Sequence, residues 1–370
     1  MRTLPDFALE RWFARWEFVA RWNLSASDVE GMRLVELLAL TDPESRELWD
    51  DLALGYTESA GHPLLRAEVA ELFEGLTPDD VLICAGAEEA VFLLANTLVG
   101  PGDAAACVVP AYQSLHEVAR AAGADVRGVP LDPDAGWALD PARWAAAVDG
   151  ARMAVVNFPH NPTGAHPGAE EFAGIVGAAV EAGAHLVSDE VYRLLEHDPR
   201  DRLPAAADLH ERAVSVGVMS KAFGLAGLRI GWIATRDHDL LDRIARLKDY
   251  TTICASAPSE ILAVFALRAR ERVLERSRGI VLANVAAMDA FASAHAGHID
   301  WTAPRAGTVA FPRLALDRPV EEWADALARD AGILLLPGSV FGDAGSRVRI
   351  GLGRRDLPAG LDALAAALGA

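Results

Sequence analysis

The chain has 370 residues, of which 52% are hydrophobic and 24% are charged, the profile of a folded globular protein with a sizeable core. Its formal net charge of −19 argues against nucleic acid and anionic membrane surfaces as partners, because neither gains from meeting a negative field. It contains no apolar run near the ~20 residues that cross a bilayer and no basic leader followed by an apolar run, so we expect a cytoplasmic protein.

The first elements are expected to be helical. Residues 7–22 place aromatic and apolar side chains at near-helical spacing, which predicts an amphipathic helix. Glu17 stands among these aromatic residues, either as a solvent-facing acid or as a substrate contact, since a charge in such surroundings is seldom left without a partner. Ser27 or Asp28 would cap a second helix over residues 30–40.

From residue 81 the chain alternates between strand-like and helix-like runs, which predicts an α/β fold with a mainly parallel sheet covered on both faces. The strand-like runs are 81–85, 106–109, 125–130, 152–158, 185–188 and 213–218. Beyond residue 255 the pattern becomes helical over 259–292. It then mixes short strands (309–312, 333–336 and 348–350) with a helix over 321–329, which indicates a small α+β unit.

Candidate site residues follow the predicted strands, where ligands of such sheets bind. Gly86, Ala87 and Glu88 open a helix whose free N–H groups can hold a phosphate. Tyr112 is placed either to stack on an aromatic ring or to pack in the core. Asp189, at the end of an apolar strand, would be an awkward buried carboxylate without a cationic partner.

The segment 217–232, GVMSKAFGLAGLRIGW, contains one of only two lysines in the chain, Lys221; the other is Lys248. A chain that takes nearly all its positive charge from arginine has a reason to keep an amine here, because an amine forms a Schiff base with an aldehyde and a guanidinium does not. Arg229, eight positions on, offers a fork suited to phosphate. The alternative is a solvated lysine beside a glycine-rich loop.

Asn161, held between two prolines, Asp189 and Lys221 follow one another at separations of 28 and 32 residues. This order resembles the class I/II aminotransferase family of fold-type I pyridoxal-phosphate (PLP) enzymes. The resemblance implies PLP as cofactor, a seven-stranded sheet between helices in a large domain (46–265), and a small α+β domain (266–370) joined by the N-terminal segment (1–45). It also implies a homodimer with shared active sites.

The resemblance assigns roles to individual residues. Lys221 would bind the cofactor aldehyde, and Asp189 would keep the ring nitrogen protonated, which makes the ring an electron sink. Arg349, in the segment RVRIG, would clamp the substrate α-carboxylate in a bidentate pair unless it is a surface strand residue. The remaining matches are Asn161 and Tyr192 at the cofactor's phenolate oxygen, Tyr112 on its ring, Gly86, Ala87, Glu88, Ser220 and Arg229 around its phosphate, and Tyr56 at the phosphate of the neighbouring subunit.

One position departs from the family pattern. Three residues before the lysine, where the family usually has serine or threonine facing the phosphate, this chain has Val218. Ser220 could replace that hydroxyl, so phosphate binding is expected to depend more on Arg229 and on backbone N–H groups.

The resemblance implies transfer of an amino group between an L-amino acid and a 2-oxo acid, with amino-acid and 2-oxo-acid substrates as the partners. The same chemistry can instead eliminate a β-substituent, cyclise or pass electrons to oxygen. Trp16-Glu17-Phe18, residues 23–28 and the short chain loosely resemble PLP enzymes that act on arginine derivatives, such as capreomycidine synthase, in which case Glu17 would pair with a guanidinium. Transamination is the first expectation because it is common in this fold.

Two further classes are disfavoured. A transcription regulator with an aminotransferase-like domain would need a basic DNA-binding module, and the residues before Tyr56 contain none. The three cysteines, Cys84, Cys107 and Cys254, have neither CxxC spacing nor a histidine cluster beside them, so we expect buried apolar side chains in a reducing compartment rather than a disulfide or a metal site.

Overall fold

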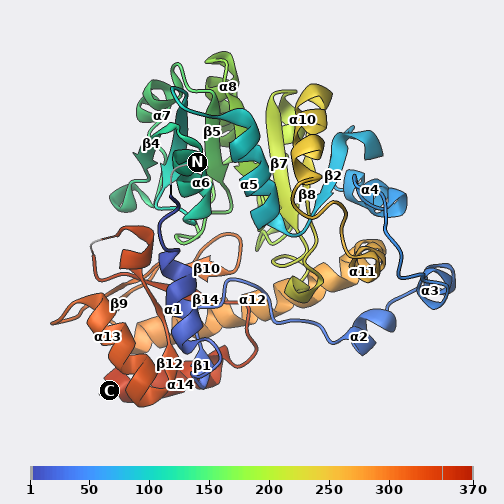
Figure 1. The fold of residues 1–370 in the computed structure, drawn as a ribbon. Helices are drawn as coiled ribbons and strands as arrows, with labels where there is room; N and C mark the ends of the chain where they lie inside the picture. Colours follow the sequence, from blue (N-terminus) through green and yellow to red (C-terminus); the bar gives the residue numbers. More distant parts are fainter. Residues whose placement is uncertain (1–2, 344, 369–370) are drawn as a thin grey trace.

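A seven-stranded sheet forms the centre of the protein (Figure 1) in a computed structural model that describes residues 3–343 and 345–368. The strand order is β2-β8-β7-β6-β5-β3-β4, and β8 runs in the direction opposite to that of the other six strands. The strands are β2 (Val81–Cys84), β3 (Ala104–Val109), β4 (Asp125–Pro130), β5 (Met153–Asn157), β6 (His185–Asp189), β7 (Ala213–Val218) and β8 (Gly231–Ala234). The predicted α/β fold and mainly parallel sheet are confirmed.

Helices cover both faces of this sheet because its strands are apolar on both sides. In β5, Met153 and Val155 pack with one set of helices, and Ala154 and Val156 pack with another. The first set is α5 (Ala87–Leu98), α6 (Ser114–Ala122) and α10 (His238–Lys248), and the second is α7 (Pro141–Val148), α8 (Ala169–Glu181) and α9 (Ala206–Leu209). At the β2–β8 edge, α4 (Pro63–Ala70) and α11 (Ala257–Arg268) complete the cover. Such strands read as continuous apolar runs in the sequence.

The C-terminal part is a smaller α+β unit, beside which the N-terminal segment lies (Figure 1). Its strands form three small sheets. The first contains β10 (Val309–Ala310), β14 (Val348–Gly351) and β13 (Leu336–Pro337), and the second contains β9 (Ile299–Asp300) and β11 (Arg313–Leu314). In the third, β12 (Ile333–Leu334) pairs with the N-terminal β1 (Trp22–Asn23). Its helices are α12 (Arg270–Ala294), α13 (Val320–Ala326) and α14 (Leu357–Leu368). The expected helical stretch over 259–292 is therefore the pair α11 and α12. The domain boundaries after residues 45 and 265 stay predictions, and the second falls inside α11.

The N-terminal helix is shorter than expected. Helix α1 spans Ala8–Trp16 and buries Leu9, Trp12 and Phe13, as the apolar spacing predicts. It stops there because the chain must become extended at Trp22, whose N–H donates to the Gly332 carbonyl oxygen where β1 pairs with β12.

The predicted helix over 30–40, with Ser27 or Asp28 as its cap, is wrong in extent and in cap. Helix α2 covers only Leu34–Leu38, and Glu36 accepts a hydrogen bond from the N–H of its N-cap residue, Arg33. The residues before it are extended, because their backbone groups pair with β14 and the residues after it; the Glu30 N–H donates to the Gly353 carbonyl oxygen at 2.8 Å. Between α2 and α4 lies one more helix, α3 (Pro43–Asp50).

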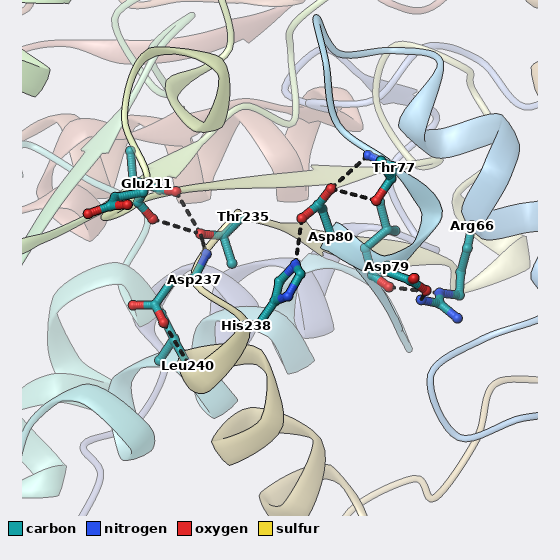
Figure 2. A network of polar contacts seen from close by, with 11 residues as sticks. Arg66, Thr77, Asp79, Asp80, Glu211, Thr235, Asp237, His238 and Leu240 are labelled. Carbon is teal, nitrogen blue, oxygen red and sulfur yellow. Dashed lines mark hydrogen bonds and ion pairs between the residues drawn. The ribbon is translucent and has the colours of Figure 1, made fainter.

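A polar network fixes the β2–β8 edge of the sheet (Figure 2). The buried Asp80, just before β2, accepts hydrogen bonds from the Thr77 N–H (2.7 Å) and hydroxyl (2.8 Å), and its other oxygen lies 2.8 Å from Nε2 of His238 in the first turn of α10. Burial by itself would raise the pKa of Asp80, but the hydrogen bonds from Thr77 and His238 hold it below the ordinary value. The ionised carboxylate thus joins the start of β2 to the start of α10.

Cys84 and Cys107 are buried, as expected, whereas Cys254 is only half-buried. Within residues 3–343 and 345–368, no three histidine, cysteine or acidic side chains gather as a metal site would require. None of the helices described above combines the length and the apolar character that crossing a membrane requires.

Candidate active site

A cavity of about 360 Å³ opens where the parallel strands β5, β6 and β7 end. Its wall contains Asn157 and Asp189, the last residues of β5 and β6, and Val218, the last residue of β7. Most of the residues singled out from the sequence line it: Glu17, Ala87, Glu88, Tyr112, Asn161, Asp189, Tyr192, Ser220, Lys221, Arg229 and Arg349. The structure therefore brings residues separated by more than 300 positions into one site.

Two predicted residues are not part of this lining. Gly86 lies behind it; its φ of +86° favours glycine, and a Cβ atom there would stand 2.8 Å from Nη2 of Arg229. Tyr56 is 90% exposed and borders a different surface hollow. The prediction that Tyr56 serves a neighbouring subunit stays a prediction.

One end of the cavity suits an anion. Helix α5 begins at Ala87 directly after Gly86, which has φ +86°, and the first N–H groups of a helix have no partner within it. The guanidinium of Arg229 lies against this helix start. A free helix N-terminus and an arginine at the same spot can bind a phosphate group.

Asp189 is a buried carboxyl group without a cationic partner. It is 7% exposed, its Oδ1 accepts a hydrogen bond from the Val191 N–H at 3.2 Å, and it forms no ion pair with any residue that the structure describes. Burial raises the pKa of Asp189 to about 7, although the hydrogen bond and the charge of Lys221 act in the opposite direction. A positively charged group in the cavity would therefore be favoured beside Asp189.

Lys221 follows β7 and the turn Met219-Ser220. Its Nζ donates a hydrogen bond to the Ser27 hydroxyl oxygen at 2.8 Å and lies 5.8 Å from the centre of the Tyr192 ring. Val218, at the position where the family usually has a hydroxyl, packs with Val191 and Tyr192. Ser220 lines the cavity, where its hydroxyl can face a ligand.

Arg349 lies in strand β14 and is 1% exposed. Its Nε and Nη2 donate to the Ser25 carbonyl oxygen (3.2 and 2.8 Å), and its Nη1 donates to Oδ1 of Asn161 at 3.1 Å. It makes no ion pair in the described part of the chain, and burial lowers its pKa. The alternative of a surface arginine is therefore wrong. A buried guanidinium with only neutral acceptors calls for a carboxylate ligand.

Tyr112 borders the cavity with its ring against Phe7 (5.0 Å between centroids), and its hydroxyl donates to Oε1 of Glu10 at 3.0 Å. Burial, then the charges of Glu88 and Glu10, raise the pKa of Tyr112, so the phenol keeps its proton. Its packing against Phe7 agrees in part with the core alternative, while its place in the lining leaves it available to a ligand ring.

Three carboxylates face the cavity from the N-terminal segment: Glu10, Glu17 and Asp28. Asp28 is neutralised by Arg354, whose Nη2 lies 3.1 Å from both carboxylate oxygens. Glu17 forms no ion pair with a residue that the structure describes, although the charge of Arg354 acts on it from a distance. Burial, together with the like charges of Asp28 and Glu10, raises the pKa of Glu17.

Sequence reasoning missed several residues of this wall: Glu10, Ser27, Asp28, Asn157, Ser114 and Arg354. The polar, turn-like surroundings of Ser27 and Asp28 predict a helix cap rather than a place in a cavity wall. Asn157 ends an apolar strand as Asp189 does, so strand-end position was the one signal that could have identified it; its Nδ2 donates to the Asp189 carbonyl oxygen at 2.8 Å.

Comparison with known proteins agrees with this geometry. Residues 22–364 match the sequence profile of the family described as aminotransferase class I and II. Capreomycidine synthase from Streptomyces vinaceus is 36% identical over 375 aligned positions, covering 100% of this chain and 95% of that protein. An aspartate aminotransferase from Thermococcus kodakarensis is 29% identical and covers 83% of this chain and 79% of its own length.

Two solved structures share the fold at 29% identity. A PLP-dependent aminotransferase from Streptococcus suis superposes with a TM-score of 0.93 and covers 99% of this chain and 98% of its own. The PLP-dependent cyclase OrfR superposes with a TM-score of 0.89 and covers 100% of this chain and 98% of its own.

The donor set of the cavity fits PLP. Asp189 would meet the ring nitrogen, Lys221 is an amine within the same wall, and Arg229 with the start of α5 would hold the phosphate. Each of these groups lacks a charged protein partner of its own among the described residues, as expected of side chains that await a ligand. The chain belongs to the class I and II aminotransferase family of PLP-dependent enzymes.

Proposed function

We propose that the chain is a PLP-dependent lyase or cyclase that acts on an arginine-type amino acid. The first expectation, transamination, depended on how common that reaction is in this fold. Among the relatives described above, capreomycidine synthase aligns along the whole chain at 36% identity, whereas the aspartate aminotransferase aligns over less of it at 29%. This balance favours the alternative considered from the sequence.

The observation that carries the proposal is a pair of carboxylates, Glu10 in α1 and Glu17 at its C-cap, neither of which forms an ion pair with a residue that the structure describes. Glu10 and Glu17 are seven residues apart, and the helical backbone of α1 continues into its C-cap, so both face the same side as Phe13, which also lines the cavity. Glu10 accepts only the Tyr112 hydroxyl, and Glu17 accepts no side-chain hydrogen bond within residues 3–343 and 345–368. Like charges held together beside a cavity favour a cationic ligand, and a planar guanidinium can bind two carboxylates at once.

The two ends of the cavity would orient such a substrate in one way. Arg349 would bind the α-carboxylate in a bidentate pair, and Glu17 with Glu10 would bind the guanidinium. This arrangement directs the α-proton toward Lys221, whose amine would remove it. When bound, PLP supplies an aldehyde for the substrate amine and a ring that accepts electrons, and Asp189 would keep a proton on the ring nitrogen.

A product panel tests the proposal. The purified enzyme, loaded with PLP, is incubated with arginine, with an arginine that carries a β-hydroxyl, and with aspartate and glutamate plus a 2-oxo acid. Cyclised product, released water or ammonia, keto acid and oxygen uptake are measured separately. We expect the β-hydroxylated arginine to lose water and to give an eliminated or cyclised product, whereas arginine itself, which has no leaving group on Cβ, should give neither. Efficient conversion of aspartate or glutamate to its keto acid, without reaction of the arginine-type compounds, would instead assign an ordinary aminotransferase.

Replacing Glu17 with glutamine is expected to lower kcat/KM for arginine-type substrates by about tenfold, since a half-buried charge pair is worth on the order of 1–2 kcal/mol. The rate with norleucine, an uncharged amino acid with a shorter, aliphatic side chain, should fall far less, because norleucine makes no charge pair with Glu17. The measurement is the ratio of kcat/KM for the two substrates in each variant.

Glu44→Gln, on the exposed helix α3, is the matched control for removing one negative charge elsewhere. If the ratio of kcat/KM for arginine to that for norleucine were unchanged in both Glu17→Gln and Glu10→Gln, these carboxylates would not recognise the substrate.

We also infer a homodimer in which each subunit completes the other's site. Large apolar side chains are exposed on a single chain, Tyr56 (90%) and Tyr250 (89%) among them. The loop containing Tyr250 is tied to the phosphate-binding helix α5, because the hydroxyls of Thr251 and Thr252 donate to Oε1 of Glu89 (2.6 and 2.8 Å). Exposed aromatic side chains close to a site favour an interface there. Light scattering should give twice the 39.4 kDa of one chain; the mass of a single chain would contradict the inference.

A further inference from the structure

The inference concerns residues 22–32, which we name the N-terminal strap. The strap runs extended along β14 and the residues that follow it, where the Gly351 N–H donates to the Leu24 carbonyl oxygen at 2.8 Å. Its backbone lies so close that a Cβ at Gly351 would stand 1.9 Å from the Ala26 carbonyl oxygen, and a Cβ at Gly353 would stand 2.1 Å from that of Asp28. These contacts fix the strap at the cavity wall.

The strap contacts three cationic side chains of the site in succession. The Ser25 carbonyl oxygen accepts from Arg349, the Ser27 hydroxyl accepts from Lys221, and Asp28 pairs with Arg354. The backbone of Ser27 is also fixed, since the Thr308 hydroxyl donates a hydrogen bond to the Ser27 carbonyl oxygen at 2.7 Å. The Ser27 hydroxyl therefore has a fixed place beside the amine of Lys221.

We propose that Ser27 is a positioning residue for Lys221: its hydroxyl oxygen holds the lysine amine at the cavity wall whenever that amine is not bonded to the cofactor. A lysine side chain has four rotatable bonds, so a free amine samples many positions unless a partner restricts it. Ser27 is the hydrogen-bond acceptor of Lys221 in the described chain. This inference depends on the role proposed above for Lys221.

The kinetic test separates positioning from support of the fold. In Ser27→Ala, exchange of the substrate α-proton with deuterated water should slow about tenfold, the loss expected when a hydrogen bond to a charged group is removed. KM should stay within about twofold, because Arg349 bonds the strap through a backbone carbonyl that the substitution leaves in place. Ser27→Thr, which keeps the hydroxyl, should restore most of the rate.

Thr308→Val is the matched control, because it loosens the strap without removing the hydroxyl that faces Lys221. It should lower Tm more than it slows exchange. If Ser27→Ala and Thr308→Val change Tm, KM and exchange in the same proportions, the role of Ser27 is structural and the proposal is overturned.

A second test needs no turnover. The chain has two lysines, so ¹³C labelling of lysine Cε gives two signals by NMR in the full-length protein after PLP is removed. Ser27→Ala should shift the Lys221 signal and leave the Lys248 signal unchanged. The Nζ of Lys248 donates to the Ile253 carbonyl oxygen at 3.0 Å, and both residues are far from the strap in the sequence. An unmoved Lys221 signal would overturn the proposal.

The proposed function and the proposed role of Ser27 can be contradicted by different results. Borohydride reduction of the PLP-loaded enzyme should leave the cofactor attached at Lys221. Attachment at Lys248, or at neither lysine, would overturn the proposed function itself. Attachment at Lys221, with the Lys221 signal and the exchange rate unchanged in Ser27→Ala, would overturn only the role of Ser27.

Discussion

Lys221→Ala should abolish covalent attachment of the cofactor and lower turnover by about 10⁴-fold or more, since one side chain would provide both the covalent link and the general base. Lys248 cannot take its place, because it is 1% exposed and its Nζ is bonded to the Ile253 carbonyl oxygen. The measurement is mass spectrometry of the borohydride-reduced protein together with kcat on an arginine-type substrate.

Lys248→Met is the control for losing a lysine. It removes a buried hydrogen bond and should lower Tm, while the cofactor remains attached at position 221. Ethylamine, added to Lys221→Ala, should restore a small part of α-proton exchange, because a free amine can occupy the space left by the side chain. A reducible cofactor adduct on Lys221→Ala itself would contradict the assigned role.

The parts of the site that the sequence could predict are those that follow parallel strands. Asn161, Asp189 and Lys221 each come after an apolar run, and such runs end at one edge of the sheet, so their proximity follows from the α/β pattern. A carboxylate that comes at the end of an apolar strand is expected to be buried. Asp189 is indeed buried, and it has no cationic partner among the described residues.

The N-terminal strap could not be predicted in the same way. Ser25, Ser27 and Asp28 sit in a short polar stretch whose local pattern favours a turn and a helix cap. Their actual conformation is set by Gly351 and Gly353, more than 300 residues later, which leave room for the strap's backbone. The local sequence does not indicate such a contact. Backbone pairing of the strap with β14 and the residues after it outweighs the local preference for a turn and a helix cap.

The choice of reaction was also beyond the local pattern. The residues that would hold PLP are the same for transamination and for elimination, so motifs at 161, 189 and 221 could not separate them. In the proposed function the difference lies in the part of the cavity wall formed by Glu10 in α1 and Glu17 at its C-cap. The aromatic neighbours of Glu17 single it out in the sequence, whereas nothing in the local pattern distinguishes Glu10 from other acidic residues of an amphipathic helix.

Asp189→Asn should lower turnover by about 10²–10³-fold, the loss typical when one preorganised electrostatic group is removed from a buried site. An amide cannot hold a proton on the ring nitrogen as a carboxylate does, so the ring accepts electrons less well. Glu190→Gln is the matched control, because Glu190 is also 7% exposed but bonds the Ala206 N–H and the Ser215 hydroxyl, away from the cavity. The Glu190→Gln substitution should lower Tm and hardly change kcat.

The same variant has the opposite effect on the stability of the protein without PLP. Burial raises the pKa of Asp189 from 3.8 to about 7, so the unfolded chain releases this proton at lower pH than the folded chain does. Ionisation of Asp189 therefore costs folding stability progressively between about pH 4 and pH 7, with the full cost present above pH 7. Cofactor-free Asp189→Asn should have a higher Tm than the unmodified chain at pH 8 and a similar Tm near pH 4. Equal Tm values at both pH values would contradict the raised pKa of Asp189, and a loss of turnover below tenfold would contradict its place opposite the ring nitrogen.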